Sequence, residues 1–368
     1  ALASAAAGRP SGDPMLDFVF GAIAGSGPDA VVLAGERLGS ASGAAALIAH
    51  GAGAGFGYVT RRAGDRGALR AGVHPRLLPG GRSFDRAEER AEVEAVWGPI
   101  MATDPGRDTA GILYAGAEHE LDVLFVVGAD PLRDLPDTAL VRRALQNVET
   151  VVVVGTELGD LAPFVSAFLP AVPVVERDGH LSTWEGRAQR VRPARSSAGL
   201  SRPDWEIFAG LALALGGDLG FETLEEIHAE MGRLLAPREA VAPALADAQN
   251  VFAAPDLELF TYPLLVDEGR SSRGAHELKA TFEEPAFVEV HPDTARAHGL
   301  EGATEALVRT NAGSATLPLR VTDHIAPGAA FVPFNQPGLA AATLLVSGAG
   351  EPAAIGSVAR VAPAEGVA

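Results

Sequence analysis

The sequence predicts an α/β domain built on a mostly parallel sheet, followed by a compact β-barrel. Three short runs rich in β-branched residues lack polar alternation, as do strands that are covered on both faces of a parallel sheet. They occupy residues 30–33, 123–127 and 151–154. Helical patterns separate these runs, whereas short strands and turns follow one another closely after about residue 255. Two different architectures therefore share the chain.

The length of the chain also favours two domains. At 368 residues it exceeds the usual size of one domain, about 100–200 residues. Residues 236–255 contain three prolines in a stretch of poor periodicity, which is typical of a linker. We therefore expect an α/β domain over residues 1–235 and a barrel domain over residues 256–368.

One helix boundary is marked by a capping pattern. Asp85 and Glu88 have the spacing of a capping box, in which each side chain accepts a hydrogen bond from the backbone of the other residue. A helix is expected from there to Trp97, with Gly98 ending it.

Two further helices are predicted from apolar stripes. Thr223 and Glu226 form a second capping box, and another helix opens at Pro203. Both stripes are expected to pack in the core. Their members are Leu224, Ile227, Met231 and Leu234 in one helix, and Trp205, Phe208, Ala212 and Leu215, stopped by Gly216, in the other.

The second domain shows the turn pattern of a small barrel. Pro292 opens a short helical turn that Gly299 closes in the left-handed conformation. Gly313 suits a hairpin with a bulge. Strands are expected at residues 263–266, 287–290, 306–310, 315–321 and 330–334, with a turn at 325–328.

Composition excludes several kinds of site. The chain contains no Cys, so it supplies no thiolate for an iron-sulfur cluster. Its nine His lack the spacing of metal ligands, even at His291 and His298, the closest pair. The net charge of −18, with Lys279 as the only Lys, argues against nucleic acid. No apolar run approaches the roughly 20 residues of a membrane span, so no direct membrane insertion is expected.

Several motifs resemble a known family. Residues 176–187, Glu-Arg-Asp-Gly-His-Leu-Ser-Thr-Trp-Glu-Gly-Arg, follow an apolar strand and the Leu-Pro pair at 169–170. This order resembles the molybdopterin oxidoreductase superfamily. Residues 61–67, 77–82 and 335–338 resemble one branch of it, the G subunit of the proton-pumping NADH-quinone oxidoreductase, which is respiratory complex I.

The resemblance implies a fold and a setting. It implies an N-terminally incomplete α/β region of the molybdopterin oxidoreductase type and a C-terminal double-psi β-barrel of the molybdopterin-dinucleotide-binding type. In the G subunit the iron-sulfur clusters belong to a part that precedes this region, so none is expected here. The implied partners are other peripheral-arm subunits, and the implied location is cytoplasmic, on the inner face of the cell membrane.

The resemblance also implies a function. We expect a non-catalytic scaffold region that supports iron-sulfur electron transfer from NADH to quinone, which takes place elsewhere, so that the chain alone has no activity. No nucleophile elbow or carboxylate pair predicts a catalytic residue. The alternative is the corresponding region of a molybdenum enzyme, such as a formate dehydrogenase, that binds bis-pterin guanine dinucleotide.

The expected site is the remnant of a cofactor pocket. Gly128 and Asp130 form the turn after a strand, where open α/β sheets place ligands, and relatives often have Asn at the position of Asp130. Thr183 likewise replaces an Asn, and Glu268 replaces a Thr that precedes Gly-Arg270. These changes remove neutral donors or add negative charge beside a polyanion, so neither cofactor nor metal is expected. The other candidates are Glu176, Gly179, Glu185 and Arg187.

Two sets of charged residues keep two interpretations each. In the first interpretation, Glu176, Glu185 and Arg187 form an acid-base set. In the second, Glu185 and Arg187 have a structural role and tie the turn to the sheet. The tie predicts that Arg187 bridges backbone carbonyls or a buried carboxylate. Residues 61–90 contain eight Arg against four acids, which is typical of a solvated face or of a docking patch for another subunit.

Overall fold

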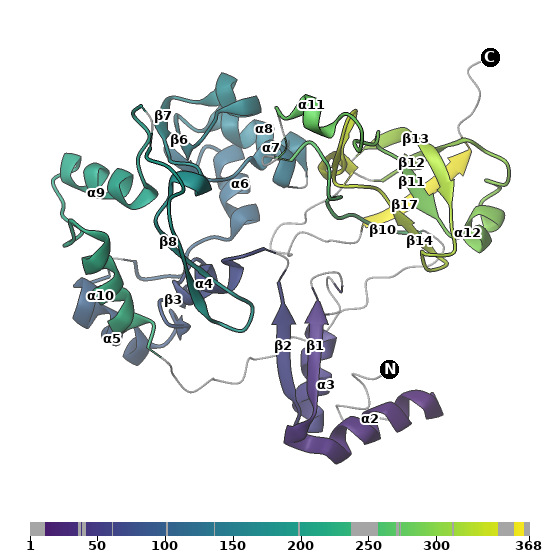
Figure 1. The fold of residues 1–368 in the computed structure, drawn as a ribbon, viewed down its shortest axis with the longest axis horizontal. Helices are drawn as coiled ribbons and strands as arrows, with labels where there is room; N and C mark the ends of the chain where they lie inside the picture. Colours follow the sequence, from purple (N-terminus) through teal and green to yellow (C-terminus); the bar gives the residue numbers. More distant parts are fainter. Residues whose placement is uncertain are drawn as a thin grey trace. The chain divides into compact units, whose positions relative to one another are not determined.

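The computed structural model describes most of the chain (Figure 1). Its described residues are 12–35, 38, 42–60, 62–100, 102–135, 137–197, 199–236, 257–269, 272, 274–310, 313–344 and 357–363. They fall into two compact units. Unit 1 comprises Ala1–Asp108, Val154–Glu157 and Phe168–Ala248, and unit 2 comprises Thr109–Val153, Leu158–Ala167 and Gln249–Ala368. Residues 237–255 of the predicted linker lie outside the described residues, and the domain boundary stays a prediction.

Unit 1 begins with a small parallel pair of strands. Its elements are α2 (Pro14–Ser26), η1 (Gly27–Asp29), β1 (Val31–Gly35), α3 (Ser42–Ala52) and β2 (Gly55–Val59). Asp13 caps α2 by accepting a hydrogen bond from the backbone N–H of Met15 at 2.9 Å. β1 and β2 run parallel, as predicted for residues 30–33. However, Val31 and Leu33 are 63% and 58% exposed, so the expectation that both faces of this strand are covered was wrong.

The rest of unit 1 packs around a small core. Its elements are α4 (Asp65–Arg70), β3 (Leu77–Leu78), β4 (Arg82–Ser83), α5 (Ala87–Trp97), η4 (Val174–Glu176), β8 (Gly179–Ser182), β9 (Ala188–Val191), α9 (Asp204–Ala214) and α10 (Leu224–Leu234). The core consists of Leu78, Phe84, Val93 and Leu234, all buried. Two antiparallel pairs, β3 with β4 and β8 with β9, complete the unit.

The two predicted capping boxes had different outcomes. At α10 the box is present: Glu226 N–H donates to Thr223 Oγ1 at 3.2 Å, and Thr223 N–H donates to Glu226 Oε2 at 2.9 Å. At α5 it is absent, because Asp85 instead accepts from the guanidinium of Arg76, and the helix starts with Arg86 as an uncapped N-cap. Gly98 ends α5 as predicted, at φ +82°.

The helices of unit 2 pack tightly. Its elements before the barrel are α6 (Thr109–Ala117), β5 (Val123–Val127), α7 (Pro131–Asp134), α8 (Thr138–Asn147) and η3 (Gly159–Phe164), while β6 (Thr150–Gly155) and β7 (Ala167–Pro170) are divided between the two units. A Cβ on Gly116 of α6 would lie 3.2 Å from the Cβ of Ala144 in α8, so the two helices approach closely.

These strands form a sheet in the order β5-β6-β7. Residues 151–155 of the central strand β6 are buried, as predicted. β5 departs from the prediction, because Val123, Phe125 and Val127 are 43–49% exposed along one face.

The second half of unit 2 is a closed barrel. Its elements are β10 (Leu257–Phe260), α11 (His276–Lys279), β11 (Val288–Val290), α12 (Pro292–Ala297), β12 (Glu305–Arg309), β13 (Ser314–Val321), β14 (Ala329–Phe331), β15 (Asn335–Gln336), β16 (Leu339–Ala340), η5 (Ala341–Leu344) and β17 (Ser357–Pro363). The barrel order is β10-β14-β11-β13-β12-β17, in which β10 with β14 and β11 with β13 are parallel. Alternate side chains fill its interior, among them Leu259, Val288, Val290, Val308 and Ala330.

Most of the barrel prediction is confirmed. Pro292 opens α12, Gly299 adopts φ +67°, and the strands after it pair as an antiparallel hairpin. Residues 263–266 are not a strand, since the first barrel strand is β10, six residues earlier. The turn residue Gly313 follows Asn311 and Ala312, which lie outside the described residues.

Candidate functional site

The turn after β5 exposes one predicted site residue and buries the other. Gly128 adopts φ +61°, a conformation that favours glycine, and nothing lies within 4 Å of a Cβ built on it. Asp130, two residues later, is only 4% exposed and precedes α7. The backbone of this turn is therefore open to solvent while its carboxylate is not.

Asp130 belongs to an acidic cluster around one arginine. Its Oδ2 lies 4.0 Å from Arg133 Nε, which donates to Asp160 Oδ2 at 3.0 Å. The Asp130 N–H donates to Asp134 Oδ2 at 3.0 Å. Asp130 and Asp160 thus share the cation of Arg133, and a third carboxylate, Asp134, lies close by at the carboxyl end of β5.

Glu176 is a buried ion-pair partner. Its side chain is 3% exposed and accepts a hydrogen bond from Arg195 Nε at 2.7 Å. The structure thus gives Glu176 an ion-pair contact with Arg195.

The other predicted residues of unit 1 lie on the β8–β9 hairpin. Gly179 begins β8 opposite Val191, and Thr183 closes the turn by accepting a hydrogen bond from the Arg187 N–H at 3.2 Å. Glu185 and Arg187 face solvent, 49% and 76% exposed at the side chain, and their charged atoms are 3.5 Å apart. The prediction that Arg187 bridges backbone carbonyls or binds a buried carboxylate is wrong.

A different arginine ties this turn to its unit. Arg66 of α4 donates from Nη1 to the carbonyl oxygen of Trp184 at 2.5 Å, across 118 residues of sequence. Its guanidinium lies over Gly186, where a Cβ would be 3.2 Å from Arg66 Nε. Gly67 also leaves room for Ser182, whose Oγ would lie 3.0 Å from a Cβ there. No signal within the Glu-Gly-Arg motif could identify Arg66, because the contact joins distant segments.

Glu268 of the barrel unit is neutralised by the only lysine. Lys279 is 3% exposed and pairs with Glu268 and, at 2.7 Å, with Glu283. Its Nζ also donates to the carbonyl oxygen of Asp267 at 3.3 Å. The hydrogen bond from Lys279 lowers the pKa of Glu268, and the bonds to Glu268 and Glu283 raise the pKa of Lys279. Arg270 lies outside the described residues.

Most arginines of residues 61–90 have partners within unit 1. Arg82 is 8% exposed and donates to the carbonyl oxygens of Pro79 and Leu234, both at 2.7 Å, while its Nε pairs with Glu92 at 2.9 Å. Other partners are Leu235 for Arg70, Asp85 for Arg76, Glu89 for Arg86 and Phe84 for Arg90. Arg61 lies outside the described residues. This segment is a structural network, and the contacts favour neither earlier interpretation.

The described cations at the two acidic turns are already paired with carboxylates, which disfavours a pterin dinucleotide there. Such a cofactor carries a pyrophosphate, which needs cations or backbone N–H groups in its site. The cations at these turns, Arg133 and Lys279, each already pair with two carboxylates. A phosphate placed beside Arg133 or Lys279 would compete with the carboxylates that these cations already bind.

Two other kinds of site are missing from the part of the chain that the structure describes. There, no group of three or more His, Asp or Glu side chains is placed to hold a metal ion. None of the described helices combines the length and the apolar character that crossing a membrane would take.

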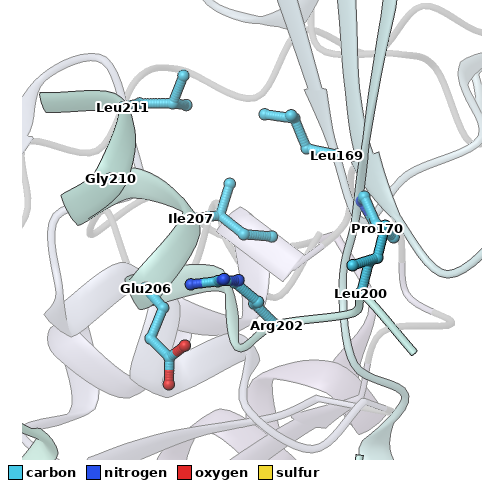
Figure 2. Close-up of a pocket in the computed structure, with 8 residues that line it drawn as sticks. All are labelled: Leu169, Pro170, Leu200, Arg202, Glu206, Ile207, Gly210 and Leu211. Carbon is cyan, nitrogen blue, oxygen red and sulfur yellow. The ribbon is translucent and has the colours of Figure 1, made fainter. Parts of the chain in front are cut away.

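An apolar groove lies elsewhere on unit 1, between α9 and the end of β7 (Figure 2). Its volume is about 320 Å³. Its lining is formed by Leu169, Pro170, Leu200, Arg202, Glu206, Ile207, Gly210 and Leu211. Figure 2 shows Leu169 and Leu211 pointing toward each other across the groove, with Arg202 and Glu206 at the other end. The sequence did not predict this groove.

Comparisons with known proteins agree on one family. The model named Molybdopterin oxidoreductase matches residues 42–214, and that of the Molydopterin dinucleotide binding domain matches residues 268–362. Over 342 residues the chain is 34% identical to the G subunit of NADH-quinone oxidoreductase from Mycobacterium tuberculosis, a match that covers 89% of this chain and 42% of that protein. The G subunit of the Streptomyces coelicolor oxidoreductase is 34% identical over 322 residues, which are 84% of this chain and 38% of that protein.

More distant proteins share the same fold. A protein of Staphylococcus aureus, provisionally named formate dehydrogenase, is 26% identical over 312 residues, 74% of this chain and 32% of its own length. Acetylene hydratase from Pelobacter acetylenicus superposes with a TM-score of 0.51 at 15% identity, over 75% of this chain and 49% of that one. The chain spans less than half the length of these curated relatives. It belongs to the molybdopterin oxidoreductase family, and along most of its length it is similar to the G subunit of NADH-quinone oxidoreductase.

Proposed function

We propose that this chain is a cofactor-free scaffold region of an NADH-quinone oxidoreductase subunit. The proposal rests on the ion pairs observed at the two turns that were expected to hold a pterin dinucleotide. At both, a carboxylate, Asp130 or Glu268, shares its cation with another acid, so among the described residues neither Arg133 nor Lys279 is left unpaired for a pyrophosphate. The similarity to the G subunit over 89% of the chain supports this choice.

The scaffold role assigns electron transfer to other parts of the complex. This chain has no Cys, so iron-sulfur clusters with thiolate ligands belong to other polypeptide segments, including the N-terminal part of the subunit. The partners are other subunits of the peripheral arm, and the complex lies at the cytoplasmic face of the membrane. In this role the chain contributes packing surface and stability to electron transfer from NADH to quinone, without a step of its own.

Metal and pterin content test the proposal. The purified oxidoreductase that contains this chain should hold less than about 0.1 molybdenum or tungsten per complex, and acid oxidation should release no fluorescent pterin. A molybdenum enzyme purified from the same cells serves as the control that the cofactor is made. Near-stoichiometric molybdenum together with pterin would refute the scaffold role.

A second candidate is a molybdenum or tungsten enzyme of the formate dehydrogenase type. The match of residues 268–362 to a dinucleotide-binding domain and the similarity to the Staphylococcus aureus protein favour it. Dye-linked formate oxidation by the same preparation distinguishes the two. Formate-dependent turnover would select this candidate, whereas NADH-dependent quinone reduction without formate activity selects the scaffold.

A further inference from the structure

Helix α9 is unusually apolar for a surface helix. Apart from Asp204 and Glu206, every residue of α9 is apolar or glycine, yet the helix contains no buried residue. Leu213 is 65% exposed, and Leu215, just beyond the helix, is 86% exposed. The predicted core role of the stripe was therefore wrong at Leu215, whereas Trp205, Phe208 and Ala212 are half-buried. Helices that are apolar on all sides are normally buried in a protein core or in a membrane.

Helix α9 is too short to span a membrane. α9 has 11 residues, and at 1.5 Å per residue it is about half as long as the roughly 30 Å hydrocarbon core of a bilayer. The apolar surface also continues beyond the helix, because Leu200 on the opposite wall of the groove is 85% exposed. A protein surface that covers both walls would remove these side chains from water together.

The groove combines apolar walls, an open glycine and a polar end. Gly210 lies in its lining, and nothing is within 4 Å of a Cβ built there, so another backbone can approach α9 closely. Leu169, Ile207 and Leu211 supply the apolar walls. Arg202 and Glu206, which carry opposite charges, lie at one end (Figure 2). An occupant with an apolar face and a polar group near one end would satisfy both parts.

We propose that this groove is covered by an apolar helix of the same oxidoreductase subunit, from a region outside the 368 residues of this chain. Two observations select this occupant. First, in the curated relatives the matched region is only 42% or 38% of the protein, so more than half of each relative lies outside it. Second, α9 is apolar on nearly all sides. Such a surface is typical of permanent interfaces, which resemble a protein core cut in half, and not of transient contacts. The assignment of the covering helix to a subunit of the oxidoreductase rests on the proposed function.

A single introduced thiol tests whether the groove is covered. The chain has no Cys, so Gly210→Cys places one thiol in the groove and none elsewhere in the chain. Gly232→Cys is the matched control, because Gly232 is also an exposed helical glycine of unit 1 with nothing within 4 Å of its Cβ, but it does not line the groove. Maleimide labelling of each peptide is measured by mass spectrometry in the isolated chain and in the complete oxidoreductase.

Assembly should slow labelling at residue 210 by about tenfold or more, whereas labelling at residue 232 should change by less than about twofold. Equal labelling of Gly210→Cys in both preparations would overturn the covered groove. A photoreactive residue at Leu200 identifies the occupant. Cross-links to the part of the subunit outside this chain support the choice, whereas cross-links to another subunit or to a second copy overturn it. Molybdenum content of the same preparation tests the scaffold role separately, so the two proposals fail independently.

Discussion

Replacing Arg82 by Met should destabilise unit 1 by about 3 kcal/mol. Methionine keeps much of the apolar volume of the side chain but removes all its donors. Two hydrogen bonds at 2.7 Å, to the carbonyl oxygens of Pro79 and Leu234, would be lost at an 8% exposed site. Bonds from a charged donor contribute about 1.5–3 kcal/mol each, and neighbouring losses are not fully additive. Glu92 adds little, because its carboxylate is 49% exposed and recovers water.

Tryptophan fluorescence in a urea titration measures this loss. Trp97, Trp184 and Trp205 all lie in unit 1, so the signal reports the unfolding of that unit. Arg187→Met is the matched control, since Arg187 is 76% exposed at the side chain and the change should cost less than about 0.5 kcal/mol. Equal unfolding midpoints for the two variants would show that the buried hydrogen bonds of Arg82 contribute nothing net.

Two further predictions concern a glycine and the buried lysine. Gly80→Ala should lower the stability of unit 1 by about 2 kcal/mol more than Gly81→Ala in the same urea titration. Both glycines have positive φ, but only at Gly80 would a Cβ overlap a carbonyl oxygen and a guanidinium. Equal losses of stability in the two variants would exclude that overlap. Lys279→Met leaves Glu268 and Glu283 facing each other without a cation. Calorimetry should show the largest drop in melting temperature near neutral pH and a smaller one near about pH 4. The wild-type stability that depends on the lowered pKa of Glu268 is lost as the pH falls through that pKa. In the variant, protonation of the carboxylates relieves their repulsion over the same pH range. A drop that stays constant with pH would contradict this account.

Local signals predicted the local features. The capping box at Thr223, the proline that opens α12 and the glycine at residue 299 all act within a few residues, and each was found as expected. The capping box at Asp85 failed because a competing partner, Arg76, takes its carboxylate from a position nine residues away. A capping residue can be recognised from sequence only where no such competitor reaches it.

Long-range contacts set the limit of the site prediction. The Glu-Gly-Arg motif drew attention to Arg187, whereas the arginine that holds this turn is Arg66, 118 residues from its acceptor. Arg82 similarly reaches Leu234 across 152 residues. For α9, periodicity identified the apolar residues but not what covers them, because an amphipathic pattern shows which side chains avoid water and not which surface excludes it.

The buried position of Lys279 also determines how this protein responds to chemical reagents. It is the only lysine in the chain, it is 3% exposed, and its ammonium is held by two carboxylates. Acylation requires the neutral amine, which burial shields and ion pairing disfavours. Succinimidyl esters and lysine-directed cross-linkers should therefore leave the side chains of this protein almost unmodified in any assembly. Reagents that activate carboxylates have 47 Asp and Glu residues to address, so acid-directed chemistry is the informative way to map the surroundings of this chain.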